Sequence, residues 1–222
     1  IENENGQTIG MVSVLSDITK QKELDNLKSA FVANVSHELR TPLVAIDKSL
    51  TLILEKEAGE LSPTQEQFLS IAQRNLKRLS ALINDLLDLS KLEAGKMEVR
   101  RKRMAINNVI QEVIDSLNNW ARSKNIMLEK RIEDMLPDVE IDPDRLAQVL
   151  TNLVGNAVKF TPNDGKITLE AKLSDGKKEL EVSVKDSGIG IAPEDLPKIF
   201  SKFYQCGGER MISDVNGTGI GL

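Results

Sequence analysis

Apolar residues recur every three or four positions along residues 21–95, and this spacing predicts two long amphipathic helices. The first apolar stripe runs from Leu24 to Ile53, and the second runs from Phe68 to Leu89. Between them, residues 62–65 (SPTQ) favour a helix start, with serine as the cap, proline in the first turn and glutamine completing a capping box. Because the connection is short, we expect the two helices to be antiparallel neighbours.

A two-helix hairpin covers only part of each apolar stripe. Pairing with a second copy would bury the remainder, so residues 21–95 are predicted to form a homodimeric four-helix bundle. Residues 7–18 are rich in β-branched and apolar residues and are interpreted as a terminal strand. A lone strand has no core, so we assign it to the end of a preceding domain.

After Gly95 the pattern alternates between short strands and helices, which predicts an α+β domain with helices on one face of a mixed sheet. The last two strands are expected to form a hairpin around residues 174–177. The expected strands are residues 97–103, 126–131, 166–173 and 180–186, and the expected helices are residues 107–123 and 142–160.

Composition excludes several classes of function. The 29 basic and 34 acidic residues give a net charge of −5, and with only one Trp, one Tyr and five Phe we expect no nucleic-acid partner. One histidine and one cysteine, Cys206, cannot form an ordinary zinc site. No apolar run approaches the ~18 residues that span a bilayer, so no membrane contact is expected within this chain. We interpret Ile1 as an internal position of a larger protein, whose localisation signals would lie upstream of it.

The single histidine, His37, lies between Val35 and Leu39 of the first apolar stripe. Two positions along a helix correspond to about 200°, so His37 is expected to face water. Glu38 can accept a hydrogen bond from one imidazole nitrogen and leave the other as a nucleophile, which is what phosphoryl acceptance requires. Pro42 removes one backbone hydrogen bond and should bend or loosen the helix nearby. For this segment alone, the alternative interpretation is a surface histidine without a function.

Two glycine-rich segments and one helix face indicate a phosphate ligand. Residues 186–190 (DSGIG) and 217–221 (GTGIG) let the backbone approach a ligand closely, although neither has the P-loop pattern or a dinucleotide-binding setting. Asn152, Asn156 and Lys159 share one helix face. An amide oxygen suits Mg²⁺ and a lysine suits phosphate, whereas the alternative interpretation is a solvated polar stripe.

Taken in order, these segments resemble the conserved boxes of sensor histidine kinases of two-component signalling, and the resemblance covers nearly the whole chain. Residues 1–20 are similar to the end of a PAS sensor domain with its linker. The five boxes are residues 31–42 (H box), 152–160 (N box), 186–190 (G1 box), 200–203 (F box) and 217–222 (G2 box).

The resemblance implies roles for individual residues. His37 would be the phosphoacceptor, Glu38 its acid/base partner, and Thr41 would position the water that dephosphorylates the regulator. Asn156 would bind Mg²⁺, with Asn152 near the same phosphates and Lys159 contacting phosphate. Asp186 would accept a hydrogen bond from the adenine amino group, and residues 204–216 would form a lid over ATP. The remaining residues implied at the nucleotide are Phe160, Gly188, Gly190, Ile191, Phe200, Phe203, Gly217, Thr218, Gly219, Gly221 and Leu222.

The resemblance also implies three domains: residues 1–20 from the PAS-like domain, residues 21–95 for dimerisation and phosphotransfer, and residues 96–222 as a GHKL-type ATP-binding sandwich. The ATP-binding domain would be incomplete at its C-terminal end, because the family's domain continues beyond the G2 box. The implied function is ATP-dependent autophosphorylation of His37, followed by transfer to an aspartate of a response regulator receiver domain and dephosphorylation of that regulator. The implied location is the cytoplasm, and anchoring of the parent protein in the cell membrane stays open.

Two other classes of protein are alternatives to a sensor histidine kinase. A non-catalytic dimeric scaffold, either a pseudokinase or a truncated fragment, would not need His37, Asn156 and Asp186 to be intact, although the ending at Leu222 favours it. A GHKL-type ATPase of the chaperone or repair kind would not need an H box on a dimerising helix, so that feature disfavours it.

Overall fold

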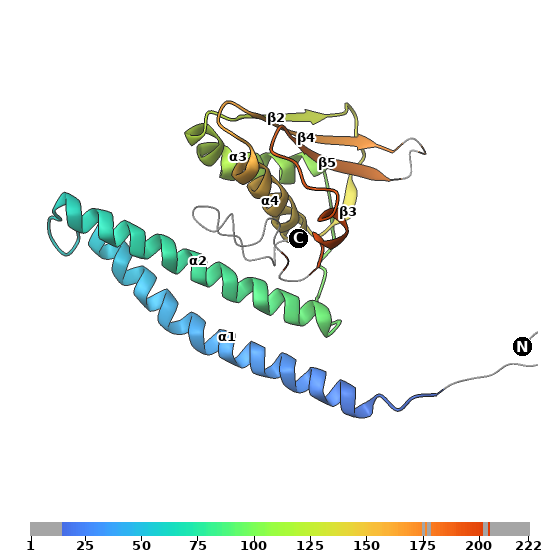
Figure 1. Ribbon diagram of the computed structural model, residues 1–222, viewed down its shortest axis with the longest axis horizontal. Helices are drawn as coiled ribbons and strands as arrows, with labels where there is room; N and C mark the ends of the chain where they lie inside the picture. The colour runs from blue at the N-terminus through green and yellow to red at the C-terminus, as the bar shows by residue number, and fades with distance from the viewer. Residues whose placement is uncertain (1–14, 175, 177–178, 202–203, 205–222) are drawn as a thin grey trace, which may run out of the picture. The chain divides into compact units, whose positions relative to one another are not determined.

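The computed structural model describes residues 15–174, 176, 179–201 and 204, and it divides into two compact units, Ile1–Met97 and Glu98–Leu222 (Figure 1). Each unit is described separately below. Within the described residues, no helix combines the length and apolar character needed to cross a membrane.

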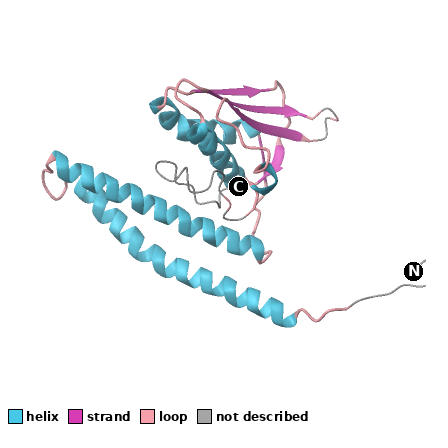
Figure 2. Ribbon diagram, viewed as in Figure 1, coloured by secondary structure: helices cyan, strands magenta, loops and turns pink. Residues whose placement is uncertain are grey.

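The first unit is an antiparallel pair of helices, α1 (Thr19–Leu54) and α2 (Pro63–Glu93) (Figure 2). The predicted capping box is present at the start of α2. The Ser62 hydroxyl accepts a hydrogen bond from the Gln65 backbone N–H at 3.3 Å, and the Ser62 N–H donates to Gln65 Oε1 at 2.8 Å. The helical hairpin expected from the apolar spacing is therefore confirmed.

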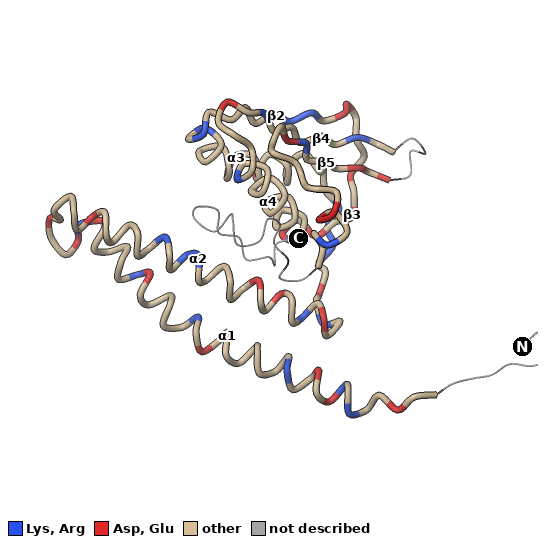
Figure 3. Tube along the Cα trace, in the orientation of Figure 1, with Lys and Arg blue, Asp and Glu red and all other residues tan. Residues whose placement is uncertain are grey.

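Few residues are buried between α1 and α2. Ser36, Leu43 and Ile83 are the buried ones among the described residues of this unit, and polar contacts add to the pairing. Arg40 Nη2 donates to Asn84 Oδ1 across the hairpin at 2.9 Å. Figure 3 shows acidic and basic residues interspersed along both helices.

Much of the apolar stripe of both helices faces solvent in the single chain. Phe31 and Phe68 are 69% and 67% exposed, respectively, which is unusual for large aromatic residues that recur at helical spacing. The other exposed apolar residues of the hairpin are Leu24, Leu27, Val35, Leu39, Val44, Ile46, Leu52, Ile71, Leu79, Leu86 and Leu92.

The second unit contains two helices and two small sheets. The three-stranded sheet has the order β2–β4–β5, with β2 parallel to β4 and β5 antiparallel to it, and the two-stranded sheet pairs β1 with β3 in antiparallel fashion. The elements are β1 (Lys102–Met104), α3 (Ile106–Ser123), β2 (Met127–Ile132), β3 (Val139–Ile141), α4 (Pro143–Phe160), β4 (Lys166–Leu173), β5 (Leu180–Asp186) and the 3₁₀ turn η1 (Leu196–Lys198).

The core of the second unit lies between its helices and the three-stranded sheet, with α3 and α4 on one face of that sheet (Figure 2). The helices contribute apolar residues every three or four positions, and β4 contributes alternate residues. The predicted mixed sheet and layered α+β arrangement are confirmed. The buried core residues are Ile106, Val109, Ile110, Val113, Ile114, Ala121, Ile126, Leu150, Val154, Ala157, Val158, Ile167, Leu169 and Ala171.

Two expectations about strands differ from the structure or lie partly outside the described residues, and one strand was missed. The strand predicted at residues 97–103 is restricted to Lys102–Met104, because that segment pairs only with the three-residue strand β3. The strand β3 was not predicted at all. Of the terminal strand expected at residues 7–18, the described residues 15–18 form no strand, and residues 7–14 lie outside the described part.

Candidate phosphoacceptor and nucleotide-binding sites

His37 lies on α1 with its side chain 76% exposed, as expected. Val35 and Leu39 are themselves 39% and 45% exposed in the single chain, so here they belong to the part of the apolar stripe that α2 does not cover. Ser36, next to His37, is the residue that faces α2, at 2% exposure. His37 and the exposed apolar stripe therefore both lie away from α2, and the imidazole is open to a reaction partner.

The carboxylate of Glu38 lies beside the imidazole, with Oε1 3.8 Å from Nδ1 of His37. This distance is too long for a hydrogen bond, so the expected bond is not formed in this conformation. Both side chains are largely exposed, and a hydrogen bond between them would need this distance to shorten to about 3 Å. The nitrogen farther from Glu38, Nε2, is then the one left with a free lone pair.

The helix α1 runs through Pro42 without a break, and Figure 1 shows it as one gently curved helix. Proline has no N–H, so the carbonyl of Glu38 lacks its usual helical donor. One turn after His37, the Thr41 hydroxyl donates a hydrogen bond to the His37 carbonyl oxygen at 3.4 Å. The Thr41 side chain is exposed on the same part of the helix as the imidazole.

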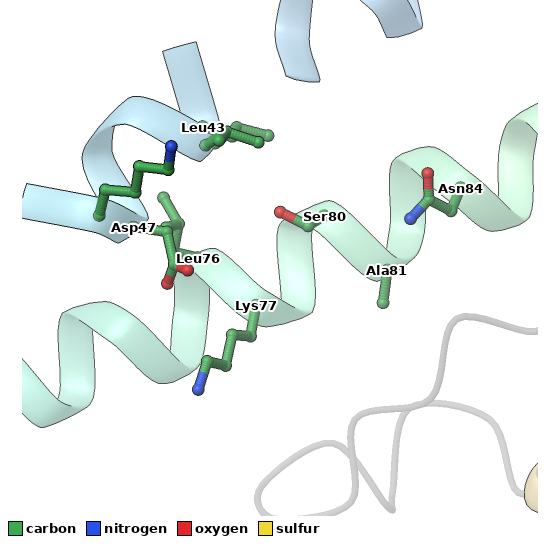
Figure 4. Close-up of a pocket in the computed structure, with 9 residues that line it drawn as sticks. Leu43, Asp47, Leu76, Lys77, Ser80, Ala81 and Asn84 are labelled. Carbon is green, nitrogen blue, oxygen red and sulfur yellow. The ribbon is translucent and has the colours of Figure 1, made fainter. Parts of the chain in front are cut away.

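A groove lies between α1 and α2, and its lining on α1 begins at Leu43, six residues after His37 (Figure 4). Sequence analysis did not predict it, because it depends on how the two helices pack. One oxygen of Asp47, Oδ1, is buried there without a hydrogen-bond partner. Farther along α2, burial and the nearby Asp88 carboxylate raise the pKa of Asp85. The groove is lined by Leu43, Val44, Asp47, Lys48, Leu76, Lys77, Ser80, Ala81 and Asn84.

In the second unit, α4 presents Asn152, Asn156 and Lys159, all of them half-buried. Lys159 Nζ lies 4.8 Å from the centre of the Phe160 ring. Asp142 caps the start of this helix by accepting a hydrogen bond from the Arg145 N–H at 3.2 Å.

The other oxygen of Asp142 accepts a hydrogen bond from the Arg100 N–H at 2.7 Å. The backbone hydrogen bonds from Arg100 and then Arg145 lower the pKa of Asp142, because they stabilise its charged form. Asp142 therefore fixes the start of α4 and also the segment that leads into β1.

The glycine loop after β5 packs directly against the end of α4. The Gly188 N–H donates to Asp186 Oδ1 at 2.8 Å, and the Ile189 N–H donates to the Phe160 carbonyl oxygen at 3.4 Å. A Cβ atom on Gly188 would lie only 2.6 Å from Asp186 Oδ1 and 2.9 Å from the Phe160 oxygen, so only glycine fits. Gly190 has φ of +72°, which also favours glycine.

The structure thus places Asp186 and Gly188 beside the C-terminal end of the helix that carries Asn156 and Lys159. Ile191 and Phe200 are exposed, at 46% and 75%. The Tyr204 hydroxyl donates to Asp195 Oδ1 at 2.6 Å. The other predicted site residues, namely Phe203, Gly217, Thr218, Gly219, Gly221 and Leu222, and most of the expected lid lie outside the described residues.

Two protein-family models match this chain. The model of the His Kinase A (phospho-acceptor) domain matches residues 27–95, and the model of the histidine kinase-, DNA gyrase B- and HSP90-like ATPase matches residues 141–222. The chain belongs to the sensor histidine kinases. The resemblance found in the sequence boxes is thereby confirmed, whereas the likeness of residues 1–20 to a PAS domain stays a prediction.

Curated relatives agree with this assignment. The sensor histidine kinase WalK of Bacillus subtilis is 35% identical over 222 residues, covering 100% of this chain and 36% of WalK. Drug sensory protein A of Synechocystis is 40% identical over 222 residues, covering 96% of this chain and 33% of the relative. The chain therefore spans about a third of the length of these relatives.

Solved structures of histidine kinases have the same fold. Full-length ShkA in complex with AMPPNP matches with a TM-score of 0.70 and 31% identity, covering 86% of this chain and 38% of ShkA. The histidine kinase ThkA, in complex with the response regulator protein TrrA, matches with a TM-score of 0.53 and 25% identity. That match covers 91% of this chain and 62% of ThkA.

Proposed function

We propose that this protein transfers the γ-phosphoryl group of ATP to His37 and then to an aspartate of a response regulator receiver domain. The observation that carries the proposal is a water-exposed imidazole on the phospho-acceptor hairpin, in a chain whose second unit is an ATP-binding domain of the histidine kinase type. The proposed domain division is residues 1–20, 21–95 and 96–222. ATP and receiver domains meet in the cytoplasm, so this portion would act there.

The phosphoryl transfer would use the nitrogen of His37 that is farther from Glu38. The lone pair of Nε2 attacks the γ-phosphorus, the bond from that phosphorus to the bridging oxygen breaks, and ADP leaves with the electron pair. Glu38 accepts the proton from Nδ1, which lies 3.8 Å from its Oε1 before the reaction. Because nucleotide and acceptor lie on different units, the attacking atom must be brought within about 3 to 3.5 Å of phosphorus.

The nucleotide would lie along α4 and the loop after β5. Asp186 accepts a hydrogen bond from the adenine amino group, and its bond from the Gly188 N–H keeps the carboxylate oriented. The Lys159 ammonium neutralises phosphate charge, and Asn152 lies one turn before Asn156 on the same helix. Gly188, Gly190 and Ile191 shape the edge of the pocket, and the exposed Phe200 is available to contact the lid.

The residues present fit a magnesium ion held mainly by the nucleotide. Within the described part of the chain, no three or more His, Cys, Asp or Glu side chains gather in a way that could hold a metal. Mg²⁺ at phosphate sites usually takes only one or two protein oxygens and the phosphates themselves. Asn156 offers such an oxygen from the half-buried face of α4. When bound, Mg²⁺ would neutralise the charge of the transferring phosphoryl group.

The partners proposed are a second copy of the chain and a receiver domain. The exposed apolar stripe of α1 and α2 supports homodimerisation into a four-helix bundle. The similarity to ThkA, solved with a response regulator, supports the second partner. Thr41 would position water for dephosphorylation of that regulator.

The alternative is a non-catalytic dimeric scaffold. It requires neither an exposed histidine nor the contact between Asp186, Gly188 and the end of α4, and both are present. A chaperone-like or repair ATPase of the same superfamily would lack the phospho-acceptor hairpin, which this chain has.

The proposed activity is tested by incubating the protein with Mg²⁺ and γ-labelled ATP. We expect an acid-labile, alkali-stable label on the chain, as a phosphohistidine gives, and mapping of the label to His37. Label that survives acid would contradict a phosphohistidine. ATP binding without any label would instead favour the scaffold.

A further inference from the structure

The C-terminal end of α4 has more carbonyl oxygens than the N–H groups of its own backbone can hydrogen-bond. The last carbonyls of a helix have no intrahelical donors, so they need partners from elsewhere. The Thr161 N–H still donates to the Ala157 oxygen at 2.9 Å. The next donor in the series would come from Pro162, which has no N–H, so the Val158 oxygen loses its regular partner.

A lysine from another helix supplies the missing donors. Lys124 Nζ lies 2.7 Å from the Val158 oxygen, 3.2 Å from the Lys159 oxygen and 2.6 Å from the Thr161 oxygen. An ammonium group has three N–H donors, so these three bonds use all of them. The positive charge also opposes the negative end of the helix dipole.

The remaining carbonyl of this turn belongs to Phe160, and it accepts its hydrogen bond from the Ile189 N–H in the glycine loop. Every carbonyl from residue 157 to residue 161 therefore has a donor. Lys124 holds the carbonyls on both sides of Phe160, and the Phe160 carbonyl between them contacts the loop that carries Asp186 and Gly188.

Lys124 itself is held in place by the turn that ends α3. Asn125 adopts a left-handed conformation with φ of +55°, and the Ile126 N–H returns to the Ala121 oxygen at 2.9 Å. The Lys124 carbonyl accepts a hydrogen bond from the Asp164 N–H at 3.2 Å, and the Asn125 side chain donates to the Asp164 carboxylate. The ammonium is thus directed at the end of α4 by a turn that is itself bonded to the segment following α4.

We propose that Lys124 is a positioning residue for nucleotide binding, which holds the last turn of α4 against the loop of residues 186–190. It would not touch ATP. It acts on Lys159, whose backbone carbonyl it binds, and on Asp186, through the contact of Phe160 with the loop. This inference rests on the proposed function, because it assigns Lys124 to the ATP site that the proposed function requires.

The test compares four variants of the same protein. Lys124→Met keeps the length and removes the donors, and Lys124→Arg keeps a charged donor. Lys130→Met is the matched control, since exposed Lys130 bonds only to the side chains of Asn107 and Gln111 among the contacts described. Ile110→Val lowers stability in the same unit at a position on α3 that is 14 residues before Lys124, which separates a positioning effect from general destabilisation.

Two quantities are measured at a temperature where every variant is folded. With a fluorescent ATP analogue and Mg²⁺, Lys124→Met should raise the dissociation constant about tenfold, and Lys124→Arg should recover most of this loss. In the nucleotide-free protein, backbone amide exchange of residues 187–190 should be faster in Lys124→Met alone.

Equal binding and equal exchange in Lys124→Met and the unmodified protein would overturn the inference, as would an equal loss of binding in Ile110→Val. Failure of the unmodified protein to bind the analogue would instead count against the proposed function. The exchange measurement would still decide whether Lys124 holds the loop, because it needs no nucleotide.

Discussion

The two units of this chain bury their apolar residues very differently. Of the 16 buried apolar residues in the described part of the chain, 14 form the core of the second unit and only Leu43 and Ile83 belong to the helical hairpin. The second unit can therefore stabilise itself within one chain. The hairpin leaves its largest apolar residues in water in the single chain, and the proposed dimerisation would bury them and stabilise it.

The chemistry proposed for each unit fits this difference. A phosphoacceptor must be reached by ATP from one side and by a receiver domain later, and His37 is accordingly exposed on a regular helix. A nucleotide site must hold several groups in fixed positions, and here the end of α4 and the loop after β5 are joined by backbone contacts. The comparison predicts that mutations in the two units will have different effects. A mutation of the hairpin stripe should weaken dimerisation, whereas a core mutation of the second unit should lower the stability of the single chain.

The largest effect is expected from Phe31→Glu on the exposed stripe of α1. In a dimer this change places one carboxylate from each copy in an apolar interface, which costs several kcal/mol. We expect the dimer dissociation constant, measured by sedimentation equilibrium, to rise by at least about 1,000-fold.

The control for this prediction is Lys22→Glu, on the opposite side of α1 from Phe31, which should leave the dimer intact. A Phe31→Glu protein that remained dimeric would show that this stripe is not the interface.

A smaller effect is expected from Ile110→Ala, which should change the stability of the second unit and not dimerisation. Ile110 is fully buried between α3 and the sheet, and truncation of such a residue costs about 2 to 5 kcal/mol of unfolding free energy. In urea titrations the second unit should unfold earlier, at a midpoint that does not change with protein concentration. A midpoint that moved with concentration would mean that the second unit also depends on association.

Thr41→Ala should separate two reactions of the hairpin. If the hydroxyl positions water, dephosphorylation of the regulator should slow by at least about tenfold while phosphorylation of His37 changes little. Both rates are measured on the same preparation, with labelled regulator and with labelled ATP. Equal losses in both reactions would remove the special role of Thr41.

The smallest effect concerns pH and Asp142. Its pKa is lower in the folded protein than in the unfolded chain, so its stabilising contribution is present at neutral pH. The contribution is lost as the pH falls through the folded pKa. The difference in urea midpoint between the unmodified protein and Asp142→Asn should therefore be larger at pH 7 than at about pH 3. Asp144→Asn, in the first turn of the same helix, is the control, and a constant difference for Asp142→Asn would contradict the assignment.

Long periodic segments could be predicted well from the sequence, because an amphipathic helix repeats the same spacing of apolar residues over several turns. The hairpin, its capping box at Ser62 and the helices α3 and α4 were all found in this way. Strand β3 was missed because three residues, Val139–Ile141, contain too little alternation to be recognised. The exposure of His37 was expected. The exposure of Val35 and Leu39 in the single chain could not be predicted, because it depends on which face of α1 packs against α2.

Contacts between distant segments could not be predicted. Lys124 lies 34 to 37 positions before the carbonyl groups that it binds, and no local pattern distinguishes it from other lysines. The close approach of Gly188 to Phe160 has the same origin, although the glycine pair itself indicated that a close approach was needed.

The most direct test of the division of labour between the units compares His37→Gln with Asp186→Asn in two assays. The account predicts that His37→Gln binds the fluorescent ATP analogue with unchanged affinity and takes up no label from γ-labelled ATP. It predicts that Asp186→Asn binds the analogue much more weakly and remains a dimer. Loss of nucleotide binding in His37→Gln, or normal binding in Asp186→Asn, would contradict the account.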